Sequence, residues 1–429
     1  MSLSRAVLDL SPLRASRAFR DLWLGSSAAA LGGQFVMVAV LYQVWELTQS
    51  AFWTGAIGLA RAVPLIIFGL VGGAIADAAD RRRVVRWTTV AQLVAALGLA
   101  AQALLAVESL ALLLALVALQ AAFGALGIPA KRALPPRLLP PAKVPAGIAL
   151  QHLSFQVAML VGPAVAGIVI AELGLTWAFS VQAVTFVLAW LGVLRLPSMP
   201  PLERADRPGL RAMADGVRMV WRRPVLRGSF VTDLFATLLV MPISLFPLIN
   251  ELRFGGSAST LGLFLSAVAV GGIGAGLFSG SFTRARRAGL VQLIAAGTWG
   301  VALAGFGLAQ PLWLALGLLA VAGAADTISV VTRAAMVQLD TPDSHRGRVS
   351  AVESVIGQAG PDVGNFRGGV VAGLTSAPIA LATGGIACVL GVAFVGWRNR
   401  ALRRYELPTA EVPSRGPVPE SSPPAQPDS

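Results

Sequence analysis

Five ionisable side chains inside apolar stretches of the sequence are candidates for chemistry. They are Arg61, Asp233, Asp326, Asp362 and Arg367. A charged group in apolar surroundings is costly unless it pairs with an opposite charge or reaches water, and a carboxylate there can instead bind and release a proton. Asp362 is the leading candidate for this chemistry, because it lies near the middle of its apolar stretch beside Pro361, which removes a backbone hydrogen bond.

The other four groups lie nearer the ends of their stretches. Asp233 and Asp326 are within reach of water, so each is either a further proton-coupling residue or part of a structural interface. Arg61 and Arg367 are expected to face a central cavity, where they could pair with Asp362 or attract an anionic substrate; the alternative is that they extend to the outer surface. Polar residues expected at the same cavity are Gln34 and Asn365.

The composition identifies the elements that must position these groups. Hydrophobic residues make up 55% and charged residues 13% of the 429 residues, and the mean hydropathy is +0.72. Soluble domains carry about 25% charged residues. Apolar segments close to the roughly 20 residues that cross a bilayer recur along the chain. We place them at 22–45, 52–76, 85–107, 110–128, 147–171, 175–196, 228–250, 259–281, 289–308, 311–333, 349–373 and 376–397. The sequence therefore predicts an all-α integral membrane protein with twelve spans.

The basic residues predict how these spans are oriented. The chain has 34 Lys and Arg and a net charge of +13. If the N-terminus is cytoplasmic and the spans alternate, all but Arg61, Arg253 and Arg367 fall on the cytoplasmic side. Basic residues concentrate there in membrane proteins. Both termini are therefore expected in the cytoplasm. The positive charge on this side indicates contact with membrane lipids. We therefore expect no nucleic-acid partner. No cleaved signal peptide is predicted.

Several kinds of chemistry have no support in the sequence. Cys388 is the one cysteine, and His152 and His345 are the two histidines, which leaves too few ligands for a cysteine or histidine metal site. The sequence has no Gly-x-x-x-x-Gly-Lys-Ser/Thr loop and no His-Glu-x-x-His pair. We therefore expect no metal, no cofactor and no enzymatic activity.

The chain divides into two halves joined by a linker. We place a cytoplasmic segment at 1–21, a first six-helix half at 22–196, a linker at 197–227, a second half at 228–397 and a disordered tail at 398–429. Gly162-Pro163 in the fifth span recurs as Gly360-Pro361 in the eleventh. Such echoes indicate a duplicated six-helix unit, although chance is an alternative in a chain so rich in Gly and Ala.

The linker contains one amphipathic stretch. Its apolar positions fall on one helical face, at Leu210, Met213, Val217 and Trp221. Its basic positions, Arg211, Arg218 and Arg222, lie elsewhere on the helix. This pattern predicts a short helix on the inner leaflet, held by anionic lipid headgroups.

The segment from Gly72 to Arg83 combines glycines, an acid and three arginines where the second span ends. It resembles the loop between the second and third helices of the major facilitator superfamily. The matching residues are Gly73, Asp77, Arg81 and Arg82, and the departures are Ala78 and Asp80. The resemblance implies the major facilitator fold, transport by alternating access, and an inner gate in which Asp77 approaches the start of the eleventh helix. There, Ser350 and Glu353 have the spacing of a capping box. Because a single chain of twelve spans can be complete, we expect a monomer.

Two further segments resemble exporters of this superfamily. Gly162, Pro163 and Gly167 match most of a Gly-Pro-x-x-Gly-Gly element in the fifth helix. The segments 346–351 and 360–367 are similar to the branch that contains bacterial enterobactin exporters, although Asn365 stands where that branch often has glutamate. The resemblance implies an inner-membrane protein that exports a siderophore or a drug.

The leading hypothesis is proton-coupled export of an amphipathic organic compound. Proton-coupled uptake of a small solute is an alternative, which the Gly-Pro element of the fifth span disfavours. A membrane sensor that does not transport and a membrane enzyme are the remaining alternatives.

Overall fold

The structure is a computed structural model that describes residues 9–200, 210–278, 287–342 and 345–406, without the side chains of a few helical positions. Within these ranges the regular elements are all helices. Those before the linker are α1 (Ser11–Ala15), α2 (Arg17–Thr48), α3 (Ala51–Ala78), α4 (Arg81–Leu104), α5 (Leu110–Arg132), α6 (Pro135–Leu138), the 3₁₀ helix η2 (Pro141–Lys143), α7 (Val144–Leu173) and α8 (Leu175–Leu194). Six of them are long enough to cross a bilayer, as expected for the first half.

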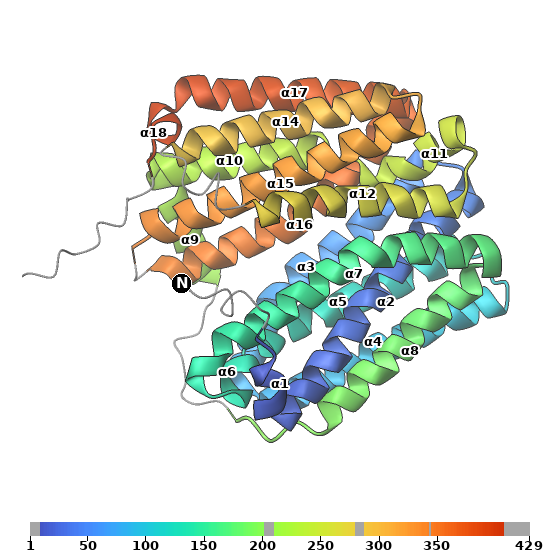
Figure 1. Ribbon diagram of the computed structural model, residues 1–429, viewed down its shortest axis with the longest axis vertical. Coiled ribbons are helices and arrows are strands. Elements are labelled where there is room, and N and C mark those ends of the chain that lie inside the picture. Colours follow the sequence, from blue (N-terminus) through green and yellow to red (C-terminus); the bar gives the residue numbers. More distant parts are fainter. Residues whose placement is uncertain (1–8, 201–209, 279–286, 343–344, 407–429) are drawn as a thin grey trace, which may run out of the picture.

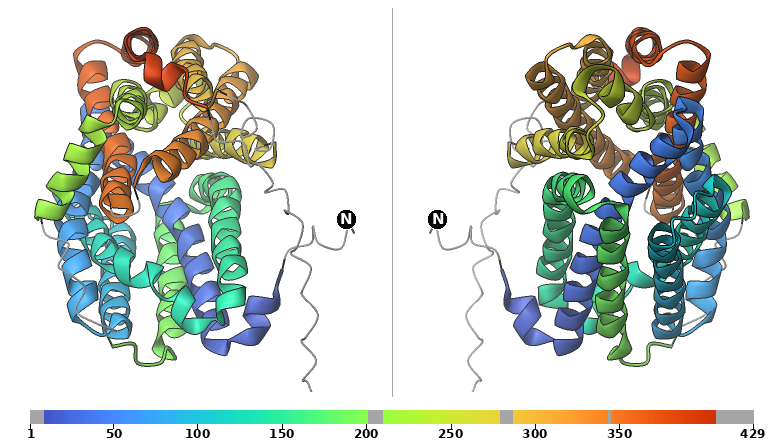
Figure 2. Two further views of the ribbon diagram at one scale, coloured as in Figure 1. Left: turned by 90° about the vertical axis from the view of Figure 1, so that its left-hand side faces the viewer. Right: turned by 90° about the vertical axis from the view of Figure 1, so that its right-hand side faces the viewer.

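The second half follows the linker helix α9 (Leu210–Arg222). Its elements are α10 (Pro224–Leu239), the 3₁₀ helix η3 (Ile243–Leu245), α11 (Phe246–Phe254), α12 (Ala258–Leu277), α14 (Ala288–Leu308), α15 (Leu312–Asp340), α16 (Arg346–Leu374), α17 (Ala377–Arg398) and α18 (Arg400–Arg403). Phe246, Phe264 and Phe306 meet edge to face in its core, with ring centroids 5.4–5.5 Å apart. The N-terminal helices gather on one side and the C-terminal helices on the other (Figure 2).

Helices occupy all twelve predicted intervals, but they do not all have the character of a membrane span. Among the described residues, eleven segments are long and apolar enough to cross a membrane, and α16 is not among them. It has 29 residues, which is sufficient length, but it contains Asp362, Arg367 and other polar residues. It packs against α3, α9, α10 and α17, so much of its surface contacts other helices.

The predicted seventh span is not one continuous helix. Residues 228–250 were expected to form a single span, whereas α10 ends at Leu239 and the chain restarts at η3 and α11. Pro242 precedes the 3₁₀ turn and Pro247 lies in the first turn of α11, so backbone donors needed for an unbroken helix are missing. The interval from Val240 to Pro242 is therefore a break inside a membrane-spanning segment.

Two helix pairs form the most extensive contacts between the halves. α3 packs against α16, and α7 packs against α12. The four helices run through the middle of the molecule, and the halves approach most closely towards the end where α11 lies (Figure 1). α6 and α9 lie towards the opposite end.

The linker helix differs in part from its prediction. α9 forms where it was expected, but it packs against α16, with Gly216 next to the carbonyl oxygen of Arg348 and with Val220 buried. Asp215 pairs with Arg348 at 3.8 Å. Val217 and Trp221 are exposed, so an apolar strip is still available for lipid. Helix α9 thus docks on the second half as well as presenting an apolar face.

Candidate functional site

The ion pair between Arg61 and Asp362 joins the two halves. Arg61 lies on α3 and Asp362 on α16, and their Nε and Oδ2 atoms are 3.9 Å apart. The side chain of Asp362 is 12% exposed and that of Arg61 is 46% exposed. The carboxylate is thus enclosed while its partner reaches open space, so the structure brings together the two residues that the sequence suggested could pair.

Glycines allow α3 and α16 to approach at this point. A Cβ atom on Gly55 would come 3.0 Å from the Cα atom of Gly369 and 3.1 Å from the carbonyl oxygen of Asn365. Gly58 lies directly against the carbonyl of Asp362. Small residues at a helix crossing bring the backbones close, as is common in membrane proteins. The crossing therefore fixes Arg61 and Asp362 on facing surfaces.

The residues Asn365 and Arg367, which the sequence predicted at the cavity, make hydrogen bonds with the backbone around the end of α10. The Oδ1 atom of Asn365 accepts a hydrogen bond from the Ser244 N–H at 3.2 Å, and its backbone oxygen accepts one from the Ser244 hydroxyl at 2.7 Å. The guanidinium of Arg367 donates to the carbonyl oxygen of Leu239, where α10 ends. The carbonyls at the end of a helix lack partners within the helix. Both side chains are therefore occupied at the break between α10 and η3.

A residue of the first half also binds the segment that follows the break. The hydroxyl of Thr54 on α3 donates to the carbonyl oxygen of Ser244 at 2.8 Å, and Thr54 is buried. Ser244 thus contacts both α3 and α16. We call Thr54, Leu239, Ser244, Asn365 and Arg367 the α10 clasp.

The second contact between the halves contains the predicted Gly-Pro element. Pro163 lies inside α7, and the N–H of Ala164 donates to the Ser266 hydroxyl of α12 at 3.1 Å. A Cβ atom on Gly167 would come 3.0 Å from the Cα atom of Ser259, and one on Gly162 would come 2.9 Å from the Cγ atom of Gln34. The element thus contacts α12 on one side and α2 on the other, with Gln34 packed against it.

A second group of charges lies within the second half. Arg333 of α15 pairs with Asp233 of α10, and its Nε atom is 3.6 Å from Glu353 of α16. Arg333 and Asp233 are buried, and both lie close enough to Asp326 to interact with it electrostatically. The side chain of Asp326 lies at the surface of α15. In this Arg333 cluster two carboxylates, those of Asp233 and Glu353, contact the guanidinium, and the carboxylate of Asp326 lies nearby. The described residues contain no group suited to a metal ion.

One sequence interpretation changes at this cluster, and one pairing was missed. Helix α16 begins at Arg346, so Ser350 and Glu353 lie inside it and do not form a capping box. The sequence reasoning did not consider Arg333 as a partner of Asp326, although it lies seven residues after Asp326 on the same helix. Two helical turns place such residues on one face, which is the signal that could have identified the pair.

The loop after α3 anchors the start of the linker. The carboxylate of Asp80 accepts hydrogen bonds from the Arg82 N–H at 2.9 Å, the Met199 N–H at 3.0 Å and the Ser198 hydroxyl at 2.7 Å. The N–H of Arg81 donates to the carbonyl oxygen of Met199 at 3.2 Å. Asp80 therefore caps α4 and ties it to the residues that follow α8. Gly73 and Asp77 belong to the last turns of α3, but their side chains are outside the described part of the chain.

The environment of Asp80 changes its proton affinity. Burial acts to raise the pKa of this carboxyl, but hydrogen bonds from Ser198, Met199 and Arg82, together with the charge of Arg83, outweigh burial and lower the pKa below its usual value. Asp80 is therefore suited to a fixed structural role.

The sequence candidates thus fall into separate places. Glu353 and Asp362 are nine residues apart on α16, which corresponds to about 13 Å along the helix. The Arg333 cluster and the Arg61–Asp362 pair therefore lie at different depths along one helix. Asp80 belongs to neither group.

Comparison with known proteins agrees with this architecture. Residues 8–420 match the family described as transmembrane secretion effector. The chain is similar to the enterobactin exporter EntS of Shigella boydii serotype 18, with 26% identity over 389 residues that cover 90% of this chain and 93% of that protein. EntS of Escherichia coli O139:H28 has the same identity and coverage.

Solved structures show the same fold. A POT family transporter in complex with 5-aminolevulinic acid superposes with a TM-score of 0.72 at 11% identity, covering 90% of this chain and 97% of that one. A bacterial homologue of the iron transporter ferroportin in an inward-facing state gives a TM-score of 0.67 at 17% identity, with coverage of 90% and 99%.

These relatives are transporters and not enzymes. Together with the eleven apolar segments, they identify a multi-pass protein of the inner membrane. The match over residues 8–420 shows that the chain belongs to the transmembrane secretion effector family of the major facilitator superfamily.

Proposed function

We propose that this protein is a proton-driven exporter that moves an amphipathic organic compound, such as a siderophore or a drug, out of the cytoplasm. The observation that carries the proposal is the ion pair between Arg61 and Asp362. It lies on the contact that alternating access must open and close. A carboxylate at such a contact couples movement of the halves to binding of a proton.

The proposal includes an orientation in the membrane. Both chain ends and α9 face the cytoplasm, in keeping with the distribution of Lys and Arg, and α16 crosses the membrane as the eleventh of twelve spans. The close contacts at Gly55 and Gly167 then belong to the outer part of the molecule. We therefore interpret the conformation as inward-facing, with the outer side closed.

The transport cycle begins from this state. Arg61 holds Asp362 in its charged form while the substrate enters from the cytoplasm. Rocking of the halves opens the outer side and separates the pair. The unpaired carboxylate then takes a proton from the outer solution, because an isolated charge in a poorly hydrated site is costly. When the outer side closes again, Arg61 returns to Asp362 and favours release of the proton to the cytoplasm.

The Arg333 cluster supports a second proton-binding step during transport. Asp233, Asp326 and Glu353 offer three carboxylates to the single guanidinium of Arg333. Repulsion among the acids favours retention of a proton by one of them. In the proposed orientation this cluster lies on the cytoplasmic side of Asp362. We assign to it the temporary binding of protons that move inwards.

The proposed substrate class rests on the relatives and on the exposed arginine. The similar proteins are enterobactin exporters. Arg61 is nearly half exposed and presents a positive charge to open space, which suits a compound with polar or anionic groups. The proposed partners are the substrate, protons and membrane lipids, with a monomer as the working unit.

Transport in inside-out vesicles tests the proposal. Substrate uptake into the vesicles corresponds to export from cells, and it should require an acidic lumen. A panel of siderophores and fluorescent drugs would be compared for the wild type, Asp362→Asn and Glu172→Gln, the last being an exposed acid at the end of α7. We expect Asp362→Asn alone to lose the dependence on the pH gradient. A gradient-dependent Asp362→Asn protein would remove Asp362 from coupling, while transport in the opposite direction would favour an uptake protein.

A further inference from the structure

Among the described residues, three arginines bind backbone carbonyls at the end of a helix. Arg86 and Arg253 do so at the ends of α8 and α14, where these helices leave the membrane. Arg367 donates to the carbonyl oxygen of Leu239 at the end of α10. The span that contains α10 runs from Pro224 to Phe254, so Leu239 lies near its middle. The third arginine therefore binds a helix end inside a membrane-spanning segment.

The break after α10 leaves carbonyls that need donors. The last four carbonyls of a helix have no partner within it, and in α10 they belong to residues 236–239. The carbonyl oxygen of Ala236 accepts a hydrogen bond from the Trp299 indole N–H at 3.3 Å, and that of Leu239 accepts one from Arg367. Water satisfies such groups at a membrane surface but is scarce inside the bilayer. Side chains of neighbouring helices therefore cap α10.

Glycines allow the neighbouring helices to approach this helix end. Gly364 of α16 lies against the carbonyl of Thr237 in the last turn of α10. A Cβ atom on Gly384 of α17 would come 2.9 Å from the Nη1 atom of Arg367. The guanidinium thus lies between the end of α10 and the backbone of α17.

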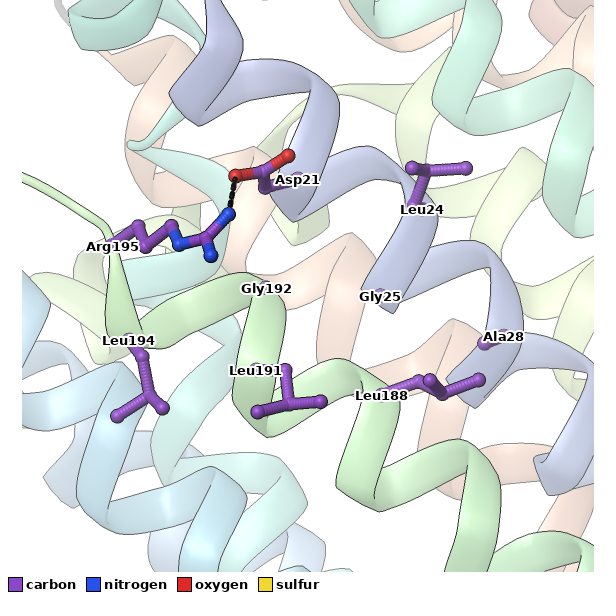
Figure 3. Close-up of a pocket in the computed structure, with 9 residues that line it drawn as sticks. All are labelled: Asp21, Leu24, Gly25, Ala28, Leu188, Leu191, Gly192, Leu194 and Arg195. Atoms are coloured by element: carbon purple, nitrogen blue, oxygen red, sulfur yellow. Dashed lines mark ion pairs between the residues drawn. The ribbon is translucent and has the colours of Figure 1, made fainter.

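The charge of Arg367 is not paired with any acid in the part of the chain that the structure describes. Asp362, the nearest acid along α16, pairs with Arg61. Figure 3 shows the contrast at the end of α8, where Arg195 faces Asp21 of α2 with their Nη1 and Oδ2 atoms 3.5 Å apart. The carbonyl end of a helix carries about half of an elementary negative charge. The end of α10 therefore provides the negative potential that Arg367 needs.

A carbonyl end inside a broken membrane helix is a place at which transporters coordinate Na⁺. We propose that Arg367 is a tethered cation that takes the place of such an ion at the end of α10. It is a positioning residue, whose positive charge holds the break and the elements η3 and α11 that follow it without Na⁺. Its charge is permanent, because a guanidinium keeps its proton in proteins.

The experiment measures the thermal midpoint of the purified full-length protein in detergent. Arg367→Ala should lower the midpoint, since it leaves the end of α10 without a cation. Arg367 is partly exposed, so a small ion can reach the vacated space. Millimolar guanidinium should raise the midpoint of Arg367→Ala towards the wild-type value and then saturate. Urea has nearly the same shape and also donates hydrogen bonds but is neutral, so it should not raise the midpoint.

Arg253→Ala is the matched control. It removes a bond of the same kind, from a guanidinium to the Ala309 carbonyl that follows α14, at 2.8 Å. Water is available at this end of the span and can replace the lost donor. The midpoint should therefore fall less than in Arg367→Ala and should not respond to guanidinium.

Two conservative variants separate charge from length. Arg367→Lys keeps a positive charge at the end of α10, whereas Arg367→Met is an unbranched neutral side chain. The lysine variant should therefore have a midpoint closer to that of the wild type.

Three results would overturn the proposal. One is equal restoration of Arg367→Ala by urea and guanidinium, because a neutral hydrogen bond would then be sufficient. Another is a lysine variant that is no more stable than the methionine variant. The third is a wild-type midpoint that is higher in sodium chloride than in an equal concentration of N-methylglucamine chloride, a comparison that needs no variant to fold. None of these measurements uses transport, so proton-driven export is tested separately.

Discussion

The α3–α16 contact and the α7–α12 contact join the same two halves with different chemistry. The first contains the Arg61–Asp362 pair and the buried polar residues Thr54 and Asn365. The second contains Gly167 and Gly262 packed against backbone, together with one hydrogen bond from Ala164 to Ser266. No ion pair between described residues crosses the second contact.

This difference separates two requirements of a rocking protein. A contact of small residues depends on shape, which protonation does not alter, so α7–α12 is suited to act as a pivot. A contact with a carboxylate and a guanidinium changes strength when the acid is protonated. We therefore expect the α3–α16 contact to change in strength with pH. We expect the α7–α12 contact to be weakened by larger side chains.

The largest expected effect comes from Asp362→Asn. Removal of one partner of an enclosed ion pair costs about 2 kcal/mol, at the low end of the usual range because Arg61 is half exposed. Proton-driven transport in inside-out vesicles should fall about thirtyfold, and its residual rate should no longer depend on luminal pH. A residual rate that still rises with luminal acidity would place coupling elsewhere, with the Arg333 cluster as the next candidate.

The next effect is expected from Gly262→Val in the proposed pivot. A side chain there would meet the carbonyl of Pro163, and such overpacking costs about 1–3 kcal/mol. The thermal midpoint of the detergent-solubilised protein should fall, and transport should decrease equally at each pH. Gly274→Val, on the same helix with open space around its Cβ position, is the control. Equal effects of the two variants would argue against close packing as the cause.

A smaller effect is expected from Ser266→Ala, which removes the one polar link described across the pivot. An intramolecular hydrogen bond contributes about 0.5–1.5 kcal/mol. The variant should lose stability in this range, as measured by thermal unfolding, and should keep the pH dependence of the wild type. A change in the pH profile would contradict the assignment of α7–α12 as insensitive to protons.

The smallest effect is expected from Asp80→Asn, which lies away from both contacts. The pKa of Asp80 is lowered in the folded protein, so its stabilising effect is complete above the unfolded value of about 4 and is lost as the pH falls through the folded value. The difference in thermal midpoint between wild type and variant should therefore be small at neutral pH and narrow further in acid. A difference in thermal midpoint that grows in acid would contradict stabilisation by the ionised carboxylate of Asp80.

The sequence was informative where apolar patterning determines structure. Its twelve intervals all contain helices, and the possible partnership of Arg61 with Asp362 followed from the cost of leaving either charge in lipid. The break at Val240 was missed because average hydropathy is unchanged by a local change in backbone conformation. Pro242 and Pro247 were the available signal.

The polar partners were harder to predict because they depend on tertiary packing. Arg367 was expected at the cavity, but it binds a carbonyl that becomes free only because α10 ends at Leu239. Glu353 was expected to cap a helix that in fact starts earlier, and it binds Arg333 instead. A single sequence does not indicate which backbone groups a neighbouring helix leaves without partners.

The polarity of α16 has a consequence for biogenesis. A helix recognised from its own hydrophobicity can enter the bilayer as it leaves the insertion machinery, but α16 falls short of that standard. Its polar groups are covered by α3 and α10, which are synthesised earlier, and by α17, which is synthesised later. Entry of α16 into the membrane should therefore wait for these neighbours, so that assembly of the two halves and insertion of this helix are completed in a single late step.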